Sequence, residues 1–174
     1  MNPTVTYLAD VCVDPVLDQE IRGLLTACFT KPQDAVFNQR RYFREPYPNR
    51  WLIRDSGGTL IAHAGVHEKQ IAVAGSSVRI GGLCEVCVHP DHRGRGHVRA
   101  LLQAIHRWLI EREFVFGVLF GDPLVYGSSG YVQVANMCLG GGPEGWRAVS
   151  ALIVELSDVP WPREETVCLP GPDF

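Results

Sequence analysis

A glycine- and arginine-rich segment, HPDHRGRGHV at residues 89–98, joins a predicted buried strand over residues 83–88 to a predicted helix. The first amides of a helix have no helical partner and carry partial positive charge, so a helix N-terminus binds anions. Gly94 and Gly96 have no Cβ atom to keep an anion from the backbone. Arg93 and Arg95 add positive charge with bidentate geometry. The segment predicts a site for a phosphate-bearing cofactor.

Two classes of cofactor fit a strand, a glycine-containing loop and a helix. A dinucleotide-binding domain would need the pattern GxGxxG directly after the strand. Here Arg99 replaces the third glycine, and several residues separate Val88 from Gly94. The dinucleotide fold remains an alternative, which titration with NAD and with coenzyme A would test.

The elements that position this loop follow from periodicity. Apolar residues recur at helical spacing in residues 15–30, after the capping pair Asp14-Pro15, and again in residues 98–109. A further helix is expected over residues 33–44. Glycine turns at residues 57–58 and 74–76 separate short strands, which predicts an antiparallel meander. Residues 115–120 form a strand parallel to residues 83–88, because a helical crossover separates the two. Strands over residues 131–137 and 151–156 complete a mixed, mainly antiparallel sheet.

The segment VCVHPDHRGRG, followed by Leu101-Leu102, resembles the acyl-CoA signature of the GCN5-related N-acetyltransferase (GNAT) superfamily. The flanking segments GGL at residues 81–83 and VYGSSGY at residues 125–131 resemble the N-terminal domain of the enhanced-intracellular-survival acetyltransferases. Aminoglycoside N-acetyltransferases are a more distant likeness. Two residues depart from the pattern: Asp91 replaces Gln or Arg, and His97 replaces a small or aliphatic residue. The resemblance implies a GNAT fold of the α/β (α+β) class, with helices on both faces of the sheet.

The resemblance also implies the cofactor site. Acetyl-CoA would be the co-substrate, and its pantetheine arm would pair with the strand backbone at Val86, Cys87 and Val88. Its phosphates would bind the loop and helix start, formed by Arg93, Gly94, Arg95, Gly96, His97 and Val98. Tyr126 matches the family tyrosine that protonates the coenzyme A sulfur.

Glu85 is a candidate general base on its own chemistry. A carboxylate among Leu83, Val86 and Val88 should have a raised pKa and could take a proton from an ammonium group. An ion pair with Arg79 is the alternative role. The expected acceptor pocket is formed by residues 14–44 and 140–147, with Tyr42, Phe43, Trp51 and Trp146 as candidate wall residues. The tail over residues 160–174 is expected to extend into solvent.

Composition narrows the class of protein. The 174 residues, 46% hydrophobic and 20% charged, predict one globular domain spanning 1–174. A net charge of −3 argues against a nucleic acid or an anionic membrane as partner. No membrane-spanning run and no secretory signal are seen, so a cytoplasmic protein is expected. The six cysteines are interpreted as buried free thiols, and no metal site is expected.

The sequence therefore predicts an enzyme, an N-acetyltransferase. It would move an acetyl group from acetyl-CoA directly to a primary amine of a small molecule, possibly one resembling an aminoglycoside, within a ternary complex. A non-catalytic acyl-CoA-binding regulatory module is the alternative. A homodimer is compatible with these features.

Overall fold

The computed structural model describes residues 3–142 and 145–174. In these residues eight strands form one mixed sheet with the hydrogen-bonded order β1-β2-β3-β4-β5-β7-β6-β8. The pairs β4–β5 and β6–β8 are parallel, whereas β1–β2, β2–β3, β5–β7 and β6–β7 are antiparallel. This is the predicted mixed, mainly antiparallel α/β class.

The chain divides into two compact units, each built from two stretches of sequence. Unit 1 comprises Met1–His67 and Cys84–Ile105, and unit 2 comprises Glu68–Leu83 and His106–Phe174. Strands β3 (Leu60–Val73) and β4 (Ser76–Val88) and helix α2 (His97–Ile110) continue from one unit into the other.

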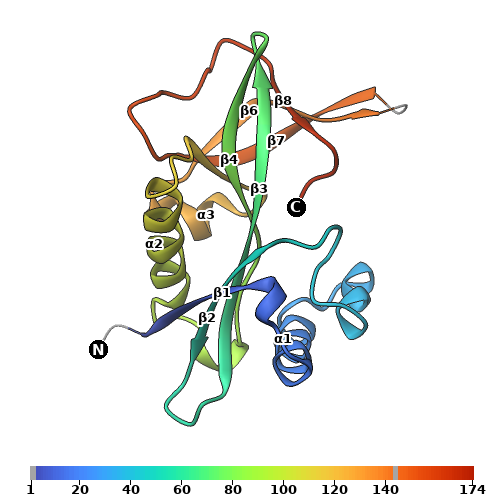
Figure 1. Cartoon of the computed structure of the whole chain (residues 1–174), viewed down its shortest axis with the longest axis vertical. Coiled ribbons are helices and arrows are strands. Elements are labelled where there is room, and N and C mark those ends of the chain that lie inside the picture. The colour runs from blue at the N-terminus through green and yellow to red at the C-terminus, as the bar shows by residue number, and fades with distance from the viewer. Residues whose placement is uncertain (1–2, 143–144) are drawn as a thin grey trace. The chain divides into compact units, whose positions relative to one another are not determined.

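Unit 1 contains β1 (Val5–Ala9), α1 (Pro15–Cys28) and β2 (Asn49–Arg54), with short 3-10 helices at Asp10–Cys12, Pro32–Asn38 and Pro90–His92 (Figure 1). The predicted cap of α1 is confirmed, because the Asp14 carboxylate accepts a hydrogen bond of 2.8 Å from the Leu17 amide. Ile21, Leu24 and Leu25 of α1 are buried against side chains of β2, β3 and β4. The amphipathic pattern of this helix thus builds the core of unit 1.

The helix predicted over residues 33–44 is wrong in its second half. A 3-10 helix ends at Asn38, and the chain then runs irregularly to β2. The groups there bond to distant parts of unit 1: the Phe43 amide bonds to Glu85, and the Arg41 guanidinium bonds to Asp10 and Asp18. These tertiary hydrogen bonds take the place of helical ones.

The first predicted hairpin is looser than expected, and the second is confirmed. Only Gly58 of the glycine pair has a positive φ, 86°, and the Asp55 carboxylate orders the loop by accepting from the amides of Gly57 and Thr59. At the second hairpin Ala74 and Gly75 are both left-handed, at φ 48° and 77°. This tight turn joins β3 directly to β4.

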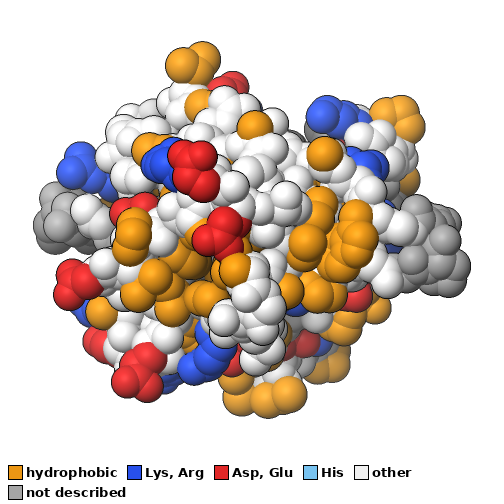
Figure 2. All heavy atoms as spheres, turned by 90° about the horizontal axis from the view of Figure 1, so that it is seen from above, with side chains coloured by type: hydrophobic (Ala, Val, Ile, Leu, Met, Phe, Trp, Pro, Cys, Tyr) orange, Lys and Arg blue, Asp and Glu red, His pale blue; other side chains and the backbone are white. Residues whose placement is uncertain are grey.

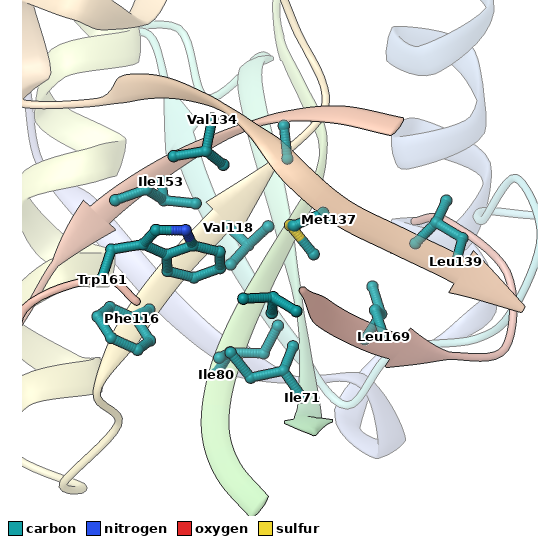
Figure 3. Close-up of a cluster of buried hydrophobic side chains, with 12 residues drawn as sticks. Ile71, Ile80, Phe116, Val118, Val134, Met137, Leu139, Ile153, Trp161 and Leu169 are labelled. Carbon is teal, nitrogen blue, oxygen red and sulfur yellow. The ribbon is translucent and has the colours of Figure 1, made fainter. Parts of the chain in front are cut away.

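Unit 2 contains β5 (Phe116–Leu119), α3 (Pro123–Tyr126), a 3-10 turn (Gly127–Ser129), β6 (Val132–Gly142), β7 (Gly145–Glu155) and β8 (Val167–Pro170). The pairing of Ala72 with Cys168 joins β8 back to β3, so the strands of this unit close into a ring. Buried side chains from every strand of the ring fill it, with Trp161 edge-on to Phe116 at 4.9 Å between ring centroids (Figure 3).

The C-terminal tail does not extend into solvent, so that prediction is wrong. Trp161 is 3% exposed, and Val167 and Leu169 of β8 are fully buried. The Phe174 ring lies 5.2 Å from the Phe120 ring and covers Gly82, where an added Cβ atom would meet it at 2.6 Å. Burial of these apolar side chains offsets the entropy lost in ordering the tail.

All six cysteines are free, as predicted, but burial is wrong for three of them, since Cys28 and Cys168 are only partly buried. Cys12 is exposed, and the Cys138 and Cys168 sulfurs lie 3.0 Å apart across the parallel pair β6–β8. No helix in the described part of the chain is long and apolar enough to cross a membrane.

Candidate active site

The predicted anion-binding loop lies in unit 1, directly after β4. The first hydrogen bond of α2 runs from the Ala100 amide to the Gly96 carbonyl, at 3.0 Å. The amides of the helix's first turn therefore have no partner within the helix. Gly94 and Gly96 are left-handed, at φ 73° and 79°, and a Cβ atom at either would meet nothing within 4 Å. The glycines thus serve the loop conformation, and the space beside them is open.

Arg93 and Arg95, the two predicted arginines, donate hydrogen bonds to backbone carbonyl groups in and directly before the loop. Arg93 donates from Nε to the Val88 carbonyl at 3.3 Å, and Arg95 donates from Nη2 to the Asp91 carbonyl at 3.1 Å. The other guanidinium nitrogen atoms of each side chain carry N–H groups beyond these bonds. His97 opens α2, and desolvation, with the nearby His92 and Arg95, lowers its pKa. Its Nδ1 atom is buried and has no hydrogen-bond partner among the described residues.

The backbone of β4 beyond Leu83 is the predicted pantetheine-binding edge. The β4–β5 register begins at Ile80–Phe116 and ends at Leu83–Leu119, whereas β4 itself runs on to Val88. In the described residues, the register therefore pairs no β4 residue after Leu83 with a residue of β5. Val86, Cys87 and Val88 lie in this part of the strand.

Glu85 departs from the extended strand. Its φ is 43°, a left-handed conformation that costs a non-glycine residue about 1–2 kcal/mol. A left-handed residue within a strand bends the backbone and redirects its own side chain, and we call this bend at Glu85 the β4 bulge. The simple alternation expected for Cys84, Glu85, Val86 and Cys87 is therefore interrupted. Nothing in the sequence predicted this conformation, since Glu is not a residue that favours a positive φ.

The Glu85 carboxylate is buried although the residue as a whole is partly exposed. Oε1 accepts a hydrogen bond of 2.8 Å from the Phe43 amide, and Oε2 has no hydrogen-bond partner among the described residues. Burial raises the pKa of Glu85, and the Tyr47 hydroxyl, the Phe43 amide, the Cys84 thiol and the Arg50 charge oppose this rise. The predicted raised pKa is confirmed in direction. Arg79 instead pairs with Glu68, at 3.6 Å in unit 2.

A buried polar network behind Glu85 was missed by sequence reasoning. Arg50 is fully buried and bonds to Asp10 at 2.5 Å, to the Tyr47 hydroxyl at 2.8 Å and to His63 Nε2 at 3.0 Å. His63 Nδ1 lies 3.0 Å from the Glu85 carbonyl oxygen. The signal was present in the sequence: Arg50 and His63 are polar residues inside two apolar strands. Only the β2–β3 register, which pairs Arg50 with Gly65, shows that the two side chains lie on one face.

Tyr126, the candidate acid, lies at the end of α3 in unit 2. The Asp122 side chain caps this short helix by accepting from the Leu124 amide at 2.9 Å. The Tyr126 ring is half-buried and lies 6.1 Å from the Tyr131 ring. A Cβ atom at Gly121 would come within 2.6 Å of the Tyr126 ring, so glycine is needed there for the ring to occupy its position.

The side chains that precede Tyr126 are apolar and exposed. Leu124 is 92% exposed and Val125 is 50% exposed. The surface next to Tyr126 in the sequence is therefore apolar. Exposed hydrophobic side chains also lie between charged ones on the face of the molecule that Figure 2 shows.

The candidate wall residues fall into two groups. Trp51 is 2% exposed, and its ring packs tilted against Tyr7 with 5.2 Å between ring centroids, so it belongs to the core and its expected place in a pocket wall is wrong. Tyr42 and Phe43 are partly exposed in unit 1, and Trp146 is 50% exposed in unit 2. The expected loop over residues 140–147 is instead a hairpin of β6 and β7, of which residues 143–144 lie outside the described part.

Unit 1 thus contains Glu85, the β4 edge and the glycine loop, and unit 2 contains Tyr126. Among the described residues, no group of three or more His, Cys, Asp or Glu side chains could hold a metal ion. A mixed sheet in which one strand continues past its parallel neighbour into a glycine loop and a helix N-terminus is an α/β arrangement that can bind an anion.

Comparison with known proteins supplies the family. Residues 18–134 match the model of the acetyltransferase (GNAT) domain, which is more than half of the chain. The chain belongs to the GNAT acetyltransferase family. No curated protein sequence matches it.

Solved structures share the fold at low sequence identity. The E. coli GNAT family N-acetyltransferase YhbS, solved in complex with CoA, is 18% identical with a TM-score of 0.64, covering 91% of this chain and 84% of that one. A GNAT family acetyltransferase from Brucella melitensis, in complex with acetyl-CoA, is 16% identical with a TM-score of 0.58, covering 95% and 96%. Eis1 from Mycobacterium abscessus is 16% identical with a TM-score of 0.56; 76% of this chain matches 33% of that one.

Proposed function

We propose that the protein is an N-acetyltransferase that moves the acetyl group of acetyl-CoA directly to a primary amine of a small molecule. The observation that carries the proposal is the open, left-handed glycine loop at the start of α2. This loop follows a strand whose residues Val86, Cys87 and Val88 lie beyond the last residue pair with β5. Membership of the acetyltransferase family supports the same reaction class.

The residues present fit acetyl-CoA as co-substrate. The first-turn amides of α2, with Gly94 and Gly96, would hold its phosphates, helped by the N–H groups of Arg93 and Arg95 that the loop does not use. His97 and Val98 would contribute as the first residues of the helix. The β4 backbone at Val86, Cys87 and Val88 would pair with the amide groups of the pantetheine arm. Structural neighbours solved with CoA and with acetyl-CoA support this assignment.

Glu85 is proposed as the general base that removes the proton of the attacking ammonium group. A base must be ionised to accept that proton, and an elevated pKa brings its affinity for protons closer to that of an amine. Because the pKa is raised, acetyl transfer should fall as the pH drops through this elevated value, at a higher pH than for an ordinary glutamate. Oε2, which has no hydrogen-bond partner among the described residues, is the oxygen proposed to accept the proton, and because this atom is buried an amine or a bridging water has to enter the site to reach it.

Tyr126 is proposed as the general acid that protonates the departing thiolate. Its support is the match to the family tyrosine and its half-buried ring, held between Gly121 and Tyr131. The proposed acceptor is a small primary amine, and the net charge of −3 is compatible with a cationic one. An aminoglycoside and a polyamine are suitable members of a test panel.

Two measurements test the proposal. Calorimetry with coenzyme A and with NAD at matched concentrations should give binding for coenzyme A alone, which separates this reading from a dinucleotide-binding domain. A thiol-release assay with acetyl-CoA and a panel of amines should give turnover. Release of no thiol with any amine, while coenzyme A still binds, would favour the non-catalytic acyl-CoA-binding module instead.

Single substitutions then assign the roles. Glu85→Gln and Tyr126→Phe should each lower kcat by about 10²-fold or more, the usual contribution of a positioned acid or base, with little change in coenzyme A affinity. Glu111→Gln, at an exposed glutamate after α2, and Tyr7→Phe, at a tyrosine of β1, are matched controls and should retain kcat. Equal rates in Glu85→Gln and its control would remove Glu85 from the mechanism.

A further inference from the structure

His63 is a fully buried histidine whose two ring nitrogen atoms are both engaged. Nε2 lies 3.0 Å from Nη1 of Arg50, and Nδ1 lies 3.0 Å from the carbonyl oxygen of Glu85. An arginine can only donate, so Nε2 must be the acceptor. The proton of the neutral ring is therefore on Nδ1, and the Nδ1–H group donates to the Glu85 carbonyl. The neighbours of His63 leave it one tautomer.

Arg50 cannot turn away from His63 without breaking several bonds. Its guanidinium bonds to Asp10 at 2.5 Å and to the Tyr47 hydroxyl at 2.8 Å, and it lies 4.2 Å from the centroid of the Tyr47 ring. The Tyr47 ring is itself fixed by Gly65, where a Cβ atom would come within 2.2 Å of it. Asp10 neutralises the buried charge and is held in turn by Arg41. The series of hydrogen-bonded side chains from Asp10 through Arg50 to His63 is thus rigid.

The hydrogen-bonded series Asp10–Arg50–His63 ends at Glu85, a residue of β4 whose backbone conformation is unfavourable. Glu85 is left-handed, and two groups outside β4 hold it: His63 Nδ1–H bonds to its carbonyl, and the Phe43 amide bonds to its carboxylate. The carbonyl bond fixes the backbone, whereas the carboxylate bond fixes the end of the side chain. If the carbonyl bond were lost, the residue could return to an extended conformation, which points its side chain elsewhere.

We propose that His63 is a positioning residue for Glu85, and that the chain Asp10–Arg50–His63 holds the β4 bulge that aims the Glu85 carboxylate. The inference rests on the proposed role of Glu85 as the base. His63 touches no substrate in this scheme and transfers no proton. The groups that face the Glu85 carboxylate itself are the Tyr47 hydroxyl, the Phe43 amide, the Cys84 thiol and the Arg50 charge.

Two substitutions of similar size separate the nitrogen atoms of His63. In His63→Asn the amide nitrogen can occupy the place of Nδ1, so the donor to the Glu85 carbonyl is kept. In His63→Gln the amide reaches the place of Nε2, so the partner of Arg50 is kept and the donor is lost. We expect His63→Gln to lower kcat tenfold or more, about the lower end of what a misplaced base costs, with the KM for acetyl-CoA within about twofold. His63→Asn should stay within about threefold of the unmodified protein.

Additional measurements distinguish positioning from a general loss of structure. In a Glu85→Gln background, His63→Gln should cause no further loss of kcat, because the base is already absent. Crystal structures should show a left-handed residue 85 in His63→Asn and an extended one in His63→Gln. Equal kcat in the two variants, a full additive loss in the double variant, or an unchanged bulge in His63→Gln would each overturn the inference.

Two situations need a second readout. If Glu85→Gln retains full activity, the proposed base is wrong, and the conformation of residue 85 in the two crystal structures still decides whether His63 holds the bulge. If His63→Gln does not fold, His63→Leu takes its place, since a leucine side chain has no donor for the Glu85 carbonyl. His63→Leu should then lower kcat at unchanged KM for acetyl-CoA, and an unchanged kcat in the folded variant would overturn the inference.

Discussion

Acidification should destabilise this protein through His63. The residue is fully buried, and desolvation, reinforced by the adjacent Arg50 charge, lowers its pKa from 6.5 to about 3. The folded protein therefore keeps His63 neutral at a pH where the unfolded chain protonates it. A group with a depressed pKa in the folded state contributes stability above its unfolded pKa, and this contribution is lost as the pH falls towards the folded pKa.

The size of the effect follows from the two pKa values. Between pH 6.5 and pH 3 each pH unit removes about 1.4 kcal/mol from the free energy of unfolding. Going from pH 7 to pH 5 should therefore cost about 2 kcal/mol through this one residue, because most of the titration of the unfolded chain lies in that interval. That loss is a large part of the ~5–15 kcal/mol by which a typical domain is stable.

Urea unfolding at pH 7 and at pH 5, followed by tryptophan fluorescence and circular dichroism, measures this loss. His63→Asn is the matched control, because it has no titratable group at position 63 while Asp10, Asp18 and Glu85 remain in both proteins. The unmodified protein should lose about 2 kcal/mol more than the variant between the two pH values. Equal losses would show that His63 is not held neutral and would refute the described network.

Three further predictions concern the two units separately. Gly121→Ala should displace the Tyr126 ring, because the added Cβ atom would lie 2.6 Å from it. In the thiol-release assay kcat should fall by about tenfold at a nearly unchanged melting temperature, and an unaffected kcat would argue against Tyr126 as the acid. Trp161→Ala should reduce the free energy of unfolding, measured in urea, by about 3–5 kcal/mol, since this buried ring packs on Phe116. A loss below about 1 kcal/mol would contradict the assignment of the tail to the core. Asp14→Ala should cost about 1 kcal/mol in the same assay by removing the cap of α1, whereas Asp14→Asn, which keeps an acceptor oxygen, should cost much less; identical losses would count against the cap.

Local sequence features made much of unit 1, and one strand pairing of unit 2, predictable. Asp14-Pro15 marks the start of α1 because a capping carboxylate and a proline each suit one position at a helix N-terminus, and both occupy those positions. The glycine loop is equally predictable from the sequence, since Gly94 and Gly96 allow the left-handed turns that lead into α2. The parallel pairing of β4 and β5 follows from a helix between two buried strands.

The elements that were misjudged depend on partners far away in the chain. Residues 39–44 have helical spacing, yet their backbone and side chains bond to Glu85, Asp10 and Asp18. The tail is rich in proline and glycine, yet Trp161 and β8 are drawn into the core of unit 2. In both cases long-range hydrogen bonds or apolar burial outweighed the local preference of the segment.

By itself, the sequence determined the mixed sheet, the helices before and after the antiparallel meander, and the residues of the glycine loop. These features were predictable because hydrophobic periodicity, helix caps and glycine turns act over a few residues. Only the tertiary structure decided the surroundings of Glu85. Its left-handed backbone, its buried oxygen and the Arg50–His63 pair that holds it come together from β2, β3, β4 and the segment before β2. A carboxylate's proton affinity is set by how much water and charge surround it, and those neighbours are chosen by strand register and packing rather than by the residues next to it in the chain.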